Sequence, residues 1–149
     1  MTLEILVRYL HFLSLVFLVT AVIGQLYFLK GQMTRREIAR VQRLDILYAA
    51  MVVVVLATGF AQWFWVGKPA EFYSSNPVFH TKVTLFLVVG ILSVYPSVFF
   101  GKQKKGDLAE IVDVPVGIAW SIRVELVLLA LMPLLASLMA KGIGIPVVD

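Results

Sequence analysis

Four long apolar stretches, separated by short polar ones, set the pattern of the chain. They cover about residues 9–29, 47–66, 79–99 and 117–140. Each has close to the ~20 residues that an α-helix needs to cross the hydrocarbon core of a bilayer. None shows the alternation of apolar and polar residues that a barrel strand requires. The pattern therefore predicts an all-α fold, an integral membrane four-helix antiparallel bundle.

The predicted helices extend beyond the apolar stretches that they contain. We expect them at about residues 5–30, 35–66, 77–101 and 115–141, with residues 1–149 forming a single transmembrane domain. The sequence T-R-R-E, with Thr34 and Glu37, is typical of a capping box and predicts the start of the second helix. Asn76 before Pro77 predicts the start of the third. Gly142 fits the C-terminal cap of the fourth.

Composition agrees with a membrane protein and excludes several kinds of site. Of 149 residues, 60% are hydrophobic and 15% are charged, against about 45–50% and 25% in soluble domains. The chain has no cysteine, which excludes disulfides, thiolate metal sites, iron–sulfur clusters and a cysteine nucleophile. The hydrolase and phosphate-loop signatures G-x-S-x-G, H-E-x-x-H and G-x-x-x-x-G-K-[ST] are absent from the sequence.

Positive charge predicts the orientation in the membrane. The loops after the first and third apolar stretches hold Lys30, Arg35, Arg36, Arg40, Arg43, Lys102, Lys104 and Lys105. The other side has only Arg8, Lys68 and Lys141, with Lys82 at the border. The positive-inside rule then places both loops in the cytoplasm and both termini outside, in the periplasm if the membrane is a bacterial inner membrane. Such charges meet anionic lipid, and no nucleic-acid partner is expected.

Helical periodicity places polar side chains on particular faces. At about 100° per residue, the first helix aligns Arg8, His11, Ser14, Leu18, Ala21 and Gln25, and the third aligns His80, Thr84, Leu87, Ile91 and Tyr95. Since polar groups avoid lipid, we expect both stripes to face the bundle interior. Lys82 lies away from the stripe of His80, and we expect it to snorkel to the surface.

The polar residues also fall into two layers by depth. His11 and His80 are expected near the outer face, at a similar level, together with Arg8, Gln62 and Lys82. A second group, expected near the inner face, contains Gln25, Asp45, Tyr48, Tyr95 and Glu125. An apolar middle separates the two layers.

Each layer has a functional and a structural interpretation. His11 and His80 could hold a metal ion or a haem iron, or could hydrogen-bond neighbours at the headgroup level. A carboxylate inside a membrane, such as Glu125, is a functional candidate by default. Its structural alternative is an ion pair with an arginine of the first cytoplasmic loop. For Asp45 we expect an ion pair with Arg43 or Arg123.

Four segments carry a family resemblance. They are R-Y-L-H-F-L at 8–13, L-A-T-G-F at 56–60, G-K-P-A-E-F-Y-S-S-N-P-V-F-H-T-K at 67–82 and R-V-E-L-V-L-L-A-L-M-P-L-L at 123–135. The chain resembles a bacterial family of small predicted membrane proteins, a domain of unknown function. This resemblance spans nearly the whole chain and implies the four-helix fold.

A more distant likeness suggests a cofactor. The L-H of the first helix and the H-x-K that opens the third are similar to protoporphyrinogen oxidase of the HemJ type, a four-helix membrane protein associated with b-type haem. The CopD-type membrane domain looks related. The resemblance implies His11 as a haem ligand, and His80 and Lys82 as the matching H-x-K.

The leading prediction is a b-type haem-binding redox membrane protein. His11 and His80 would be its axial ligands, Arg8 would meet a haem propionate, and Lys82 would tune the charge at the rim. Electron transfer with a quinone or another membrane redox partner, or porphyrinogen oxidation, would be its reaction. One alternative is a non-enzymatic small transporter or assembly subunit, in which the polar layers form a substrate or proton path and Glu125 and Asp45 are the carriers. Another is a copper site built from the two histidines and methionine.

Overall fold

Four long helices make up most of the protein. The computed structural model describes residues 2–145. Its long helices are α1 (Thr2–Phe28), α2 (Arg35–Ala61), α4 (Pro77–Gln103) and α5 (Val116–Ala140). A π-helical segment η1 (Gln62–Val66) continues α2, and a short helix α3 (Ala70–Ser74) precedes α4. Strands β1 (Gln32–Thr34) and β2 (Ile111–Asp113) lie in the two loops at the opposite end.

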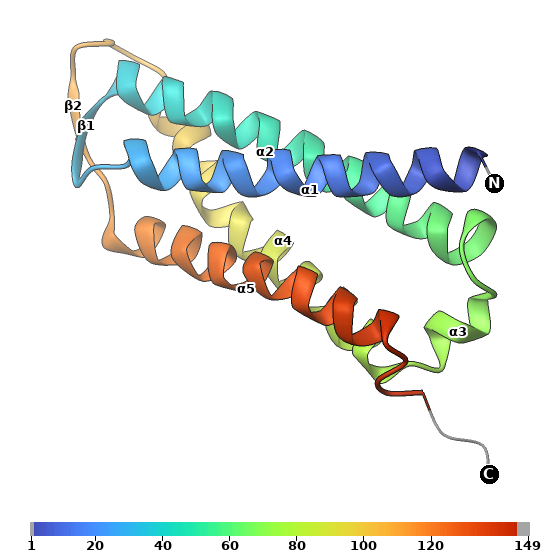
Figure 1. Ribbon diagram of the computed structural model, residues 1–149. Helices are drawn as coiled ribbons and strands as arrows, with labels where there is room; N and C mark the ends of the chain where they lie inside the picture. The colour runs from blue at the N-terminus through green and yellow to red at the C-terminus, as the bar shows by residue number, and fades with distance from the viewer. Residues whose placement is uncertain (1, 146–149) are drawn as a thin grey trace.

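The long helices form an antiparallel bundle. Successive long helices run in opposite directions; α1 packs mainly against α2, α4 against α5, and α1 also against α5 (Figure 1). Each is long and apolar enough to cross a membrane. The prediction of an all-α, four-helix membrane bundle is therefore confirmed.

The predicted helix starts follow the expected local chemistry. The Thr34 hydroxyl accepts a hydrogen bond from the Glu37 amide (3.2 Å), and a Glu37 carboxylate oxygen accepts one from the Thr34 amide (2.9 Å), which completes the capping box. The Asn76 side chain accepts a hydrogen bond from the Val78 amide at 2.9 Å, and Pro77 takes the first helical position. These bonds satisfy backbone donors that a helix start leaves unpaired.

A two-stranded antiparallel ribbon ties the two basic loops together. β1 pairs with β2 in the register Met33 opposite Val112. Beside the ribbon, the Arg35 guanidinium donates to a Glu110 carboxylate oxygen at 2.7 Å and to the Gln103 carbonyl at 2.8 Å. Its hydrogen bond and positive charge lower the pKa of Glu110. The sequence did not predict this ribbon, because three-residue strands carry too short a pattern.

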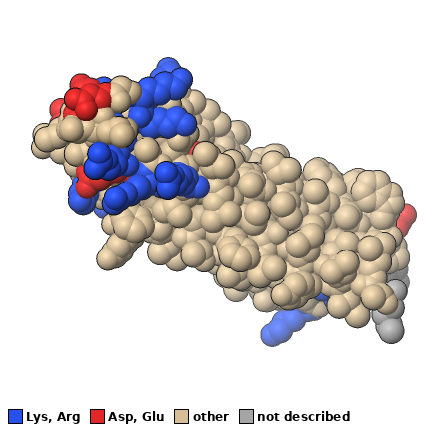
Figure 2. Space-filling view, turned by 90° about the horizontal axis from the view of Figure 1, so that it is seen from above, with Lys and Arg blue, Asp and Glu red and all other residues tan. Residues whose placement is uncertain are grey.

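Charge gathers at this end of the molecule. Figure 2 shows most of the visible Lys and Arg at one end with several Asp and Glu, while the long middle carries almost none on this face and further positive charge projects toward the opposite end. We call this the basic end; it consists of the ribbon and the adjoining ends of the long helices, namely the end of α1, the start of α2, the end of α4 and the start of α5. The bundle surface between the ends is apolar, with Ile91 72% and Val53 64% exposed. Such a surface suits lipid contact.

Candidate functional site

Polar side chains from all four long helices meet inside the bundle, closer to the basic end than to the opposite end. We call this group the inner polar cluster. It consists of Gln25 from α1, Asp45 and Tyr48 from α2, Ser93 and Ser97 from α4, and Ser121 and Glu125 from α5. The predicted inner layer is thereby largely brought together, with Tyr95 left out and three serines added.

Asp45 occupies the α2 side of the cluster. Its side chain is 6% exposed, and it accepts a hydrogen bond of 2.9 Å from the Ser97 hydroxyl. Gln25 lies beside it. The expected ion pair with Arg43 or Arg123 is wrong, since the ion pairs among residues 2–145 do not include Asp45. The Arg123 guanidinium instead lies 5.3 Å from the ring centre of Trp120.

Glu125 is buried more deeply and is less well satisfied. It is 2% exposed, and its Oε1 atom has no hydrogen-bond partner within the described part of the chain. The Tyr48 hydroxyl, also 2% exposed, has no partner at hydrogen-bond distance in this part of the chain, but it lies beside both Glu125 and Ser93, with which a small movement would pair it. An ion pair between Glu125 and an arginine of the first loop is not formed among these residues. Unpaired buried polar atoms are costly, so each requires an explanation, such as a functional role or a bound water or ion.

The cluster places two carboxyl groups within electrostatic reach of each other. Two ionised carboxylates in a low-dielectric interior, with no cation to compensate them, repel each other and lose their hydration. A site of this kind holds a proton or takes up a cation. The Tyr48 hydroxyl can both donate and accept a hydrogen bond, and it lies near both carboxyl groups. The Ser93 and Ser121 hydroxyls instead donate to backbone carbonyls of α4.

The α4 face that the sequence predicted to point inward points outward. His80, Thr84, Leu87, Ile91 and Tyr95 are all exposed. The inward face consists of Val89, Ser93, Pro96 and Phe100. The polar members of the predicted stripe lie near the two ends of the helix, where side chains can reach water or headgroups. They therefore gave no information about which face packs inside.

His11 lies inside the bundle, as predicted. It is 8% exposed, and its Nδ1 atom is 2.9 Å from the Thr58 hydroxyl of α2. Its ring faces Gly59, where an added Cβ would be 3.5 Å from Cε1. Lys82, expected to snorkel outward, is half-buried and close enough to act electrostatically on the ring. His11, Thr58 and Lys82 thus form the outer polar site of the bundle.

His80 lies in a different environment. It is exposed, and its Nε2 atom is 2.7 Å from the Ser74 carbonyl at the end of α3. Arg8 forms an exposed ion pair of 2.7 Å with Glu4. In this arrangement His11 and His80 are not placed to bind one iron as its two axial ligands. The His11 ring is buried against α2, whereas the His80 ring is exposed and bonded to the end of α3. No group of three His, Cys, Asp or Glu side chains suited to a metal ion occurs among residues 2–145.

Comparison with protein families identifies the chain. A family model described as "Predicted membrane protein (DUF2214)" matches residues 3–144, which include all four long helices. The chain belongs to the DUF2214 family. The resemblance to a family of predicted membrane proteins of unknown function is thereby confirmed, and the HemJ-type and CopD-type likenesses receive no support. No curated protein and no solved structure matches the chain.

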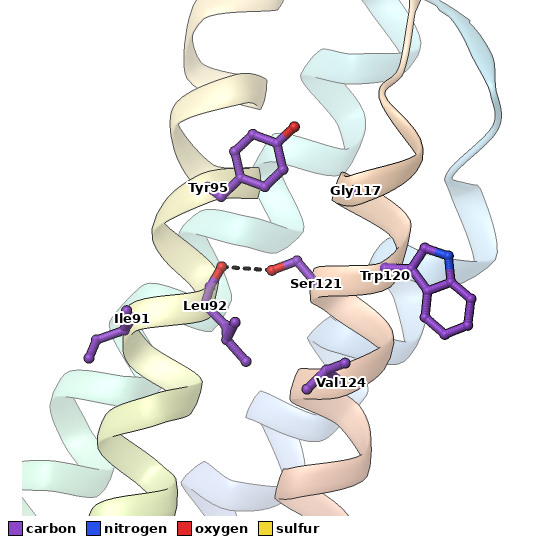
Figure 3. A pocket seen from close by; sticks show the side chains of 7 residues that line it. All are labelled: Ile91, Leu92, Tyr95, Gly117, Trp120, Ser121 and Val124. Carbon is purple, nitrogen blue, oxygen red and sulfur yellow. Dashed lines mark hydrogen bonds between the residues drawn. The ribbon is translucent and has the colours of Figure 1, made fainter.

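The DUF2214 protein has a lipid-facing groove beside its inner polar cluster. The groove has a volume of about 380 Å³ and lies between α4 and α5. Figure 3 shows the Ser121 hydroxyl donating to the Leu92 carbonyl across it, at 2.8 Å. Trp120 and Tyr95 flank the groove. Because Ser121 is one helical turn from Glu125, the groove brings the apolar surface of the DUF2214 protein close to its buried carboxyl groups.

Sequence reasoning placed Ser121 on the same face as Glu125 but missed Ser93 and Ser97 of the DUF2214 cluster. Serine in a membrane helix commonly bonds to the carbonyl of the preceding turn, as the Ser14 hydroxyl does to the Leu10 carbonyl at 2.7 Å. Ser97 differs because its hydroxyl bonds to a side chain of another helix. The available signal was the i, i+4 spacing of Ser93 and Ser97, which places both on one face of the helix. That face is opposite the one that the sequence analysis predicted to point inward.

Proposed function

We propose that the protein is a small non-enzymatic transporter whose inner polar cluster binds and releases protons. The observation that carries the proposal is Glu125, which is 2% exposed, with Oε1 unpaired among the described residues. It lies near a second buried carboxyl group, that of Asp45, and neither is compensated by an ion pair in this part of the chain. Intramembrane carboxyl groups that face a bundle interior are typical of proton pathways.

The depth of the cluster supports a transport role. Asp45 and Glu125 lie about 15 Å and 14 Å along their helices from the basic end, at 1.5 Å per residue. Beyond them, a buried apolar layer that includes Leu18, Val55 and Val89 separates the cluster from the outer polar site. An apolar layer blocks water and protons, so the site communicates with one side at a time. Transport then requires the helices to open this layer.

Proton movement into vesicles tests this proposal. The purified protein is reconstituted into potassium-loaded liposomes that contain a pH-sensitive dye, and valinomycin is added to create an inside-negative potential. We expect the interior to become acidic faster than in protein-free liposomes of the same lipid, because the cluster carries protons down the electrical gradient. Equal rates with and without protein would contradict the proposal.

Haem binding is a second candidate, favoured by the position of His11. Its imidazole is buried and faces Gly59 rather than a larger side chain, and imidazole is a common axial ligand of haem. Lys82 lies close by and could pair with a propionate. Bound haem would supply one-electron transfer, with a quinone or a membrane protein as partner.

A visible absorption spectrum tests the haem candidate. Protein purified in detergent is measured as isolated and after dithionite. A Soret band that is lost in His11→Ala and kept in His80→Ala is expected if His11 is the ligand. A colourless protein that also takes up no added haemin would exclude this candidate and leave the proton site unaffected.

A further inference from the structure

A second cavity lies at the basic end, away from the inner polar cluster. Its volume is about 260 Å³, and it lies between the end of α1 and the start of α5. Two cationic side chains, Lys30 and Arg123, line it together with the apolar side chains of Leu29, Val116 and Ala119. A cavity with two cations and an apolar wall has the chemistry to bind an anion that is attached to an apolar body.

The cations of this cavity are not fully compensated. Lys30 donates to a Glu37 carboxylate oxygen at 3.0 Å. Arg123 is exposed and forms no ion pair within residues 2–145. It lies seven residues into α5, about 10 Å from the helix start, and its guanidinium packs near the Trp120 ring. An arginine at this depth of an apolar helix extends toward the headgroups and attracts a negative charge there.

The surroundings indicate where the apolar part of the ligand lies. Val116, which lines the cavity, is 73% exposed; Trp120, one turn further along α5 at the edge of the α4–α5 groove, is 58% exposed, and Tyr27 at the end of α1 is 81% exposed. Tryptophan and tyrosine at this level are typical of the membrane interface. The first turn of α5 also has no side-chain cap, so its amide groups add to the positive potential. A soluble anion would make no use of the apolar wall.

We propose that this cavity binds the headgroup of an anionic phospholipid, with the phosphate between Lys30 and Arg123 and an acyl chain along Val116 and Trp120. Basic pockets between membrane helices are suited to anionic headgroups. A zwitterionic lipid carries the same phosphate, but its own cation competes with the two side chains. The site therefore distinguishes lipids by net charge.

Fluorescence quenching by brominated lipid tests the site. In the double variant Trp63→Phe, Trp65→Phe, Trp120 is the one remaining tryptophan of the chain. In mixed vesicles, brominated phosphatidylglycerol is expected to quench Trp120 at about a fivefold lower mole fraction than brominated phosphatidylcholine, the preference expected from about one extra cation at a membrane surface. Arg123→Gln should bring the two lipids to the same mole fraction. Arg43→Gln, which removes an exposed charge of α2 at the same end, should keep the preference.

Three results would overturn the proposal. They are equal quenching by both lipids in the double variant, a preference that survives Arg123→Gln, and displacement of the lipid by millimolar inorganic phosphate, which would indicate a soluble anion as ligand. Native mass spectrometry of the otherwise unaltered chain gives an independent reading. The spectrum should show bound phosphatidylglycerol, and Arg123→Gln should reduce the bound fraction at least about fivefold. An equal bound fraction in the unaltered protein and in Arg123→Gln would contradict the site.

Discussion

Replacement of Glu125 by glutamine should lower the rate of proton entry into liposomes at least tenfold. The amide keeps the size and much of the hydrogen bonding of the carboxyl group but cannot release a proton. Asp45→Asn should have a similar effect, because it removes the second carboxyl group and still leaves an acceptor for Ser97. The dye assay in reconstituted liposomes measures both.

Glu71→Gln is the matched control. Glu71 is an exposed carboxyl residue in α3, at the opposite end of the bundle from the ribbon. The same chemical change there should leave the rate within experimental error of the unaltered protein. If Glu125→Gln and Asp45→Asn both conduct protons at the unaltered rate, the inner polar cluster is not the proton carrier.

Glu125→Leu should stabilise the folded protein by about 1–3 kcal/mol, the desolvation cost of an unpaired buried polar group, while abolishing proton transport. The gain is expected because Oε1 has no hydrogen-bond partner among the described residues, and leucine has a similar volume. Reversible unfolding in mixed micelles with increasing SDS measures the free-energy difference.

Leu129→Ala provides the opposite comparison. Leu129 is 2% exposed, one helical turn beyond Glu125 on α5. Its truncation leaves a cavity and should destabilise the fold by about 2 kcal/mol or more. If Glu125→Leu destabilises the protein as much as Leu129→Ala, then the carboxyl group is a structural element of the bundle, and its proposed role in transport loses its energetic basis.

The helices were predictable because their signals are local. Apolar length locates the membrane spans, and both the Thr34–Glu37 capping box and the Asn76–Pro77 start depend on neighbouring residues alone. The ribbon that joins residues 32–34 to residues 111–113 depends on a pairing between distant loops. A sequence of this kind contains no local signal for such a pairing.

The site was predictable in part, for a related reason. Helical periodicity and the expected depth in the membrane placed four residues in one inner layer, since they are too polar to face lipid. They are Gln25, Asp45, Tyr48 and Glu125. The same rule failed on α4. There His80 lies in the first turn, and its ring bonds to the Ser74 carbonyl outside the bundle. The expected ion pairs with loop arginines also failed, because arginine side chains are long and reach partners that only the folded chain determines.

The most direct test is an infrared spectrum of the carboxyl groups in detergent-purified protein at about pH 7, where exposed carboxyl groups are ionised. If the inner polar cluster binds a proton, a carbonyl stretching band of a protonated carboxyl group is present in the unaltered protein, shifts on exchange into deuterium oxide, and is absent from Glu125→Gln. Spectra of the two proteins without this band, or with the same band in both, would contradict a proton shared between Glu125 and Asp45.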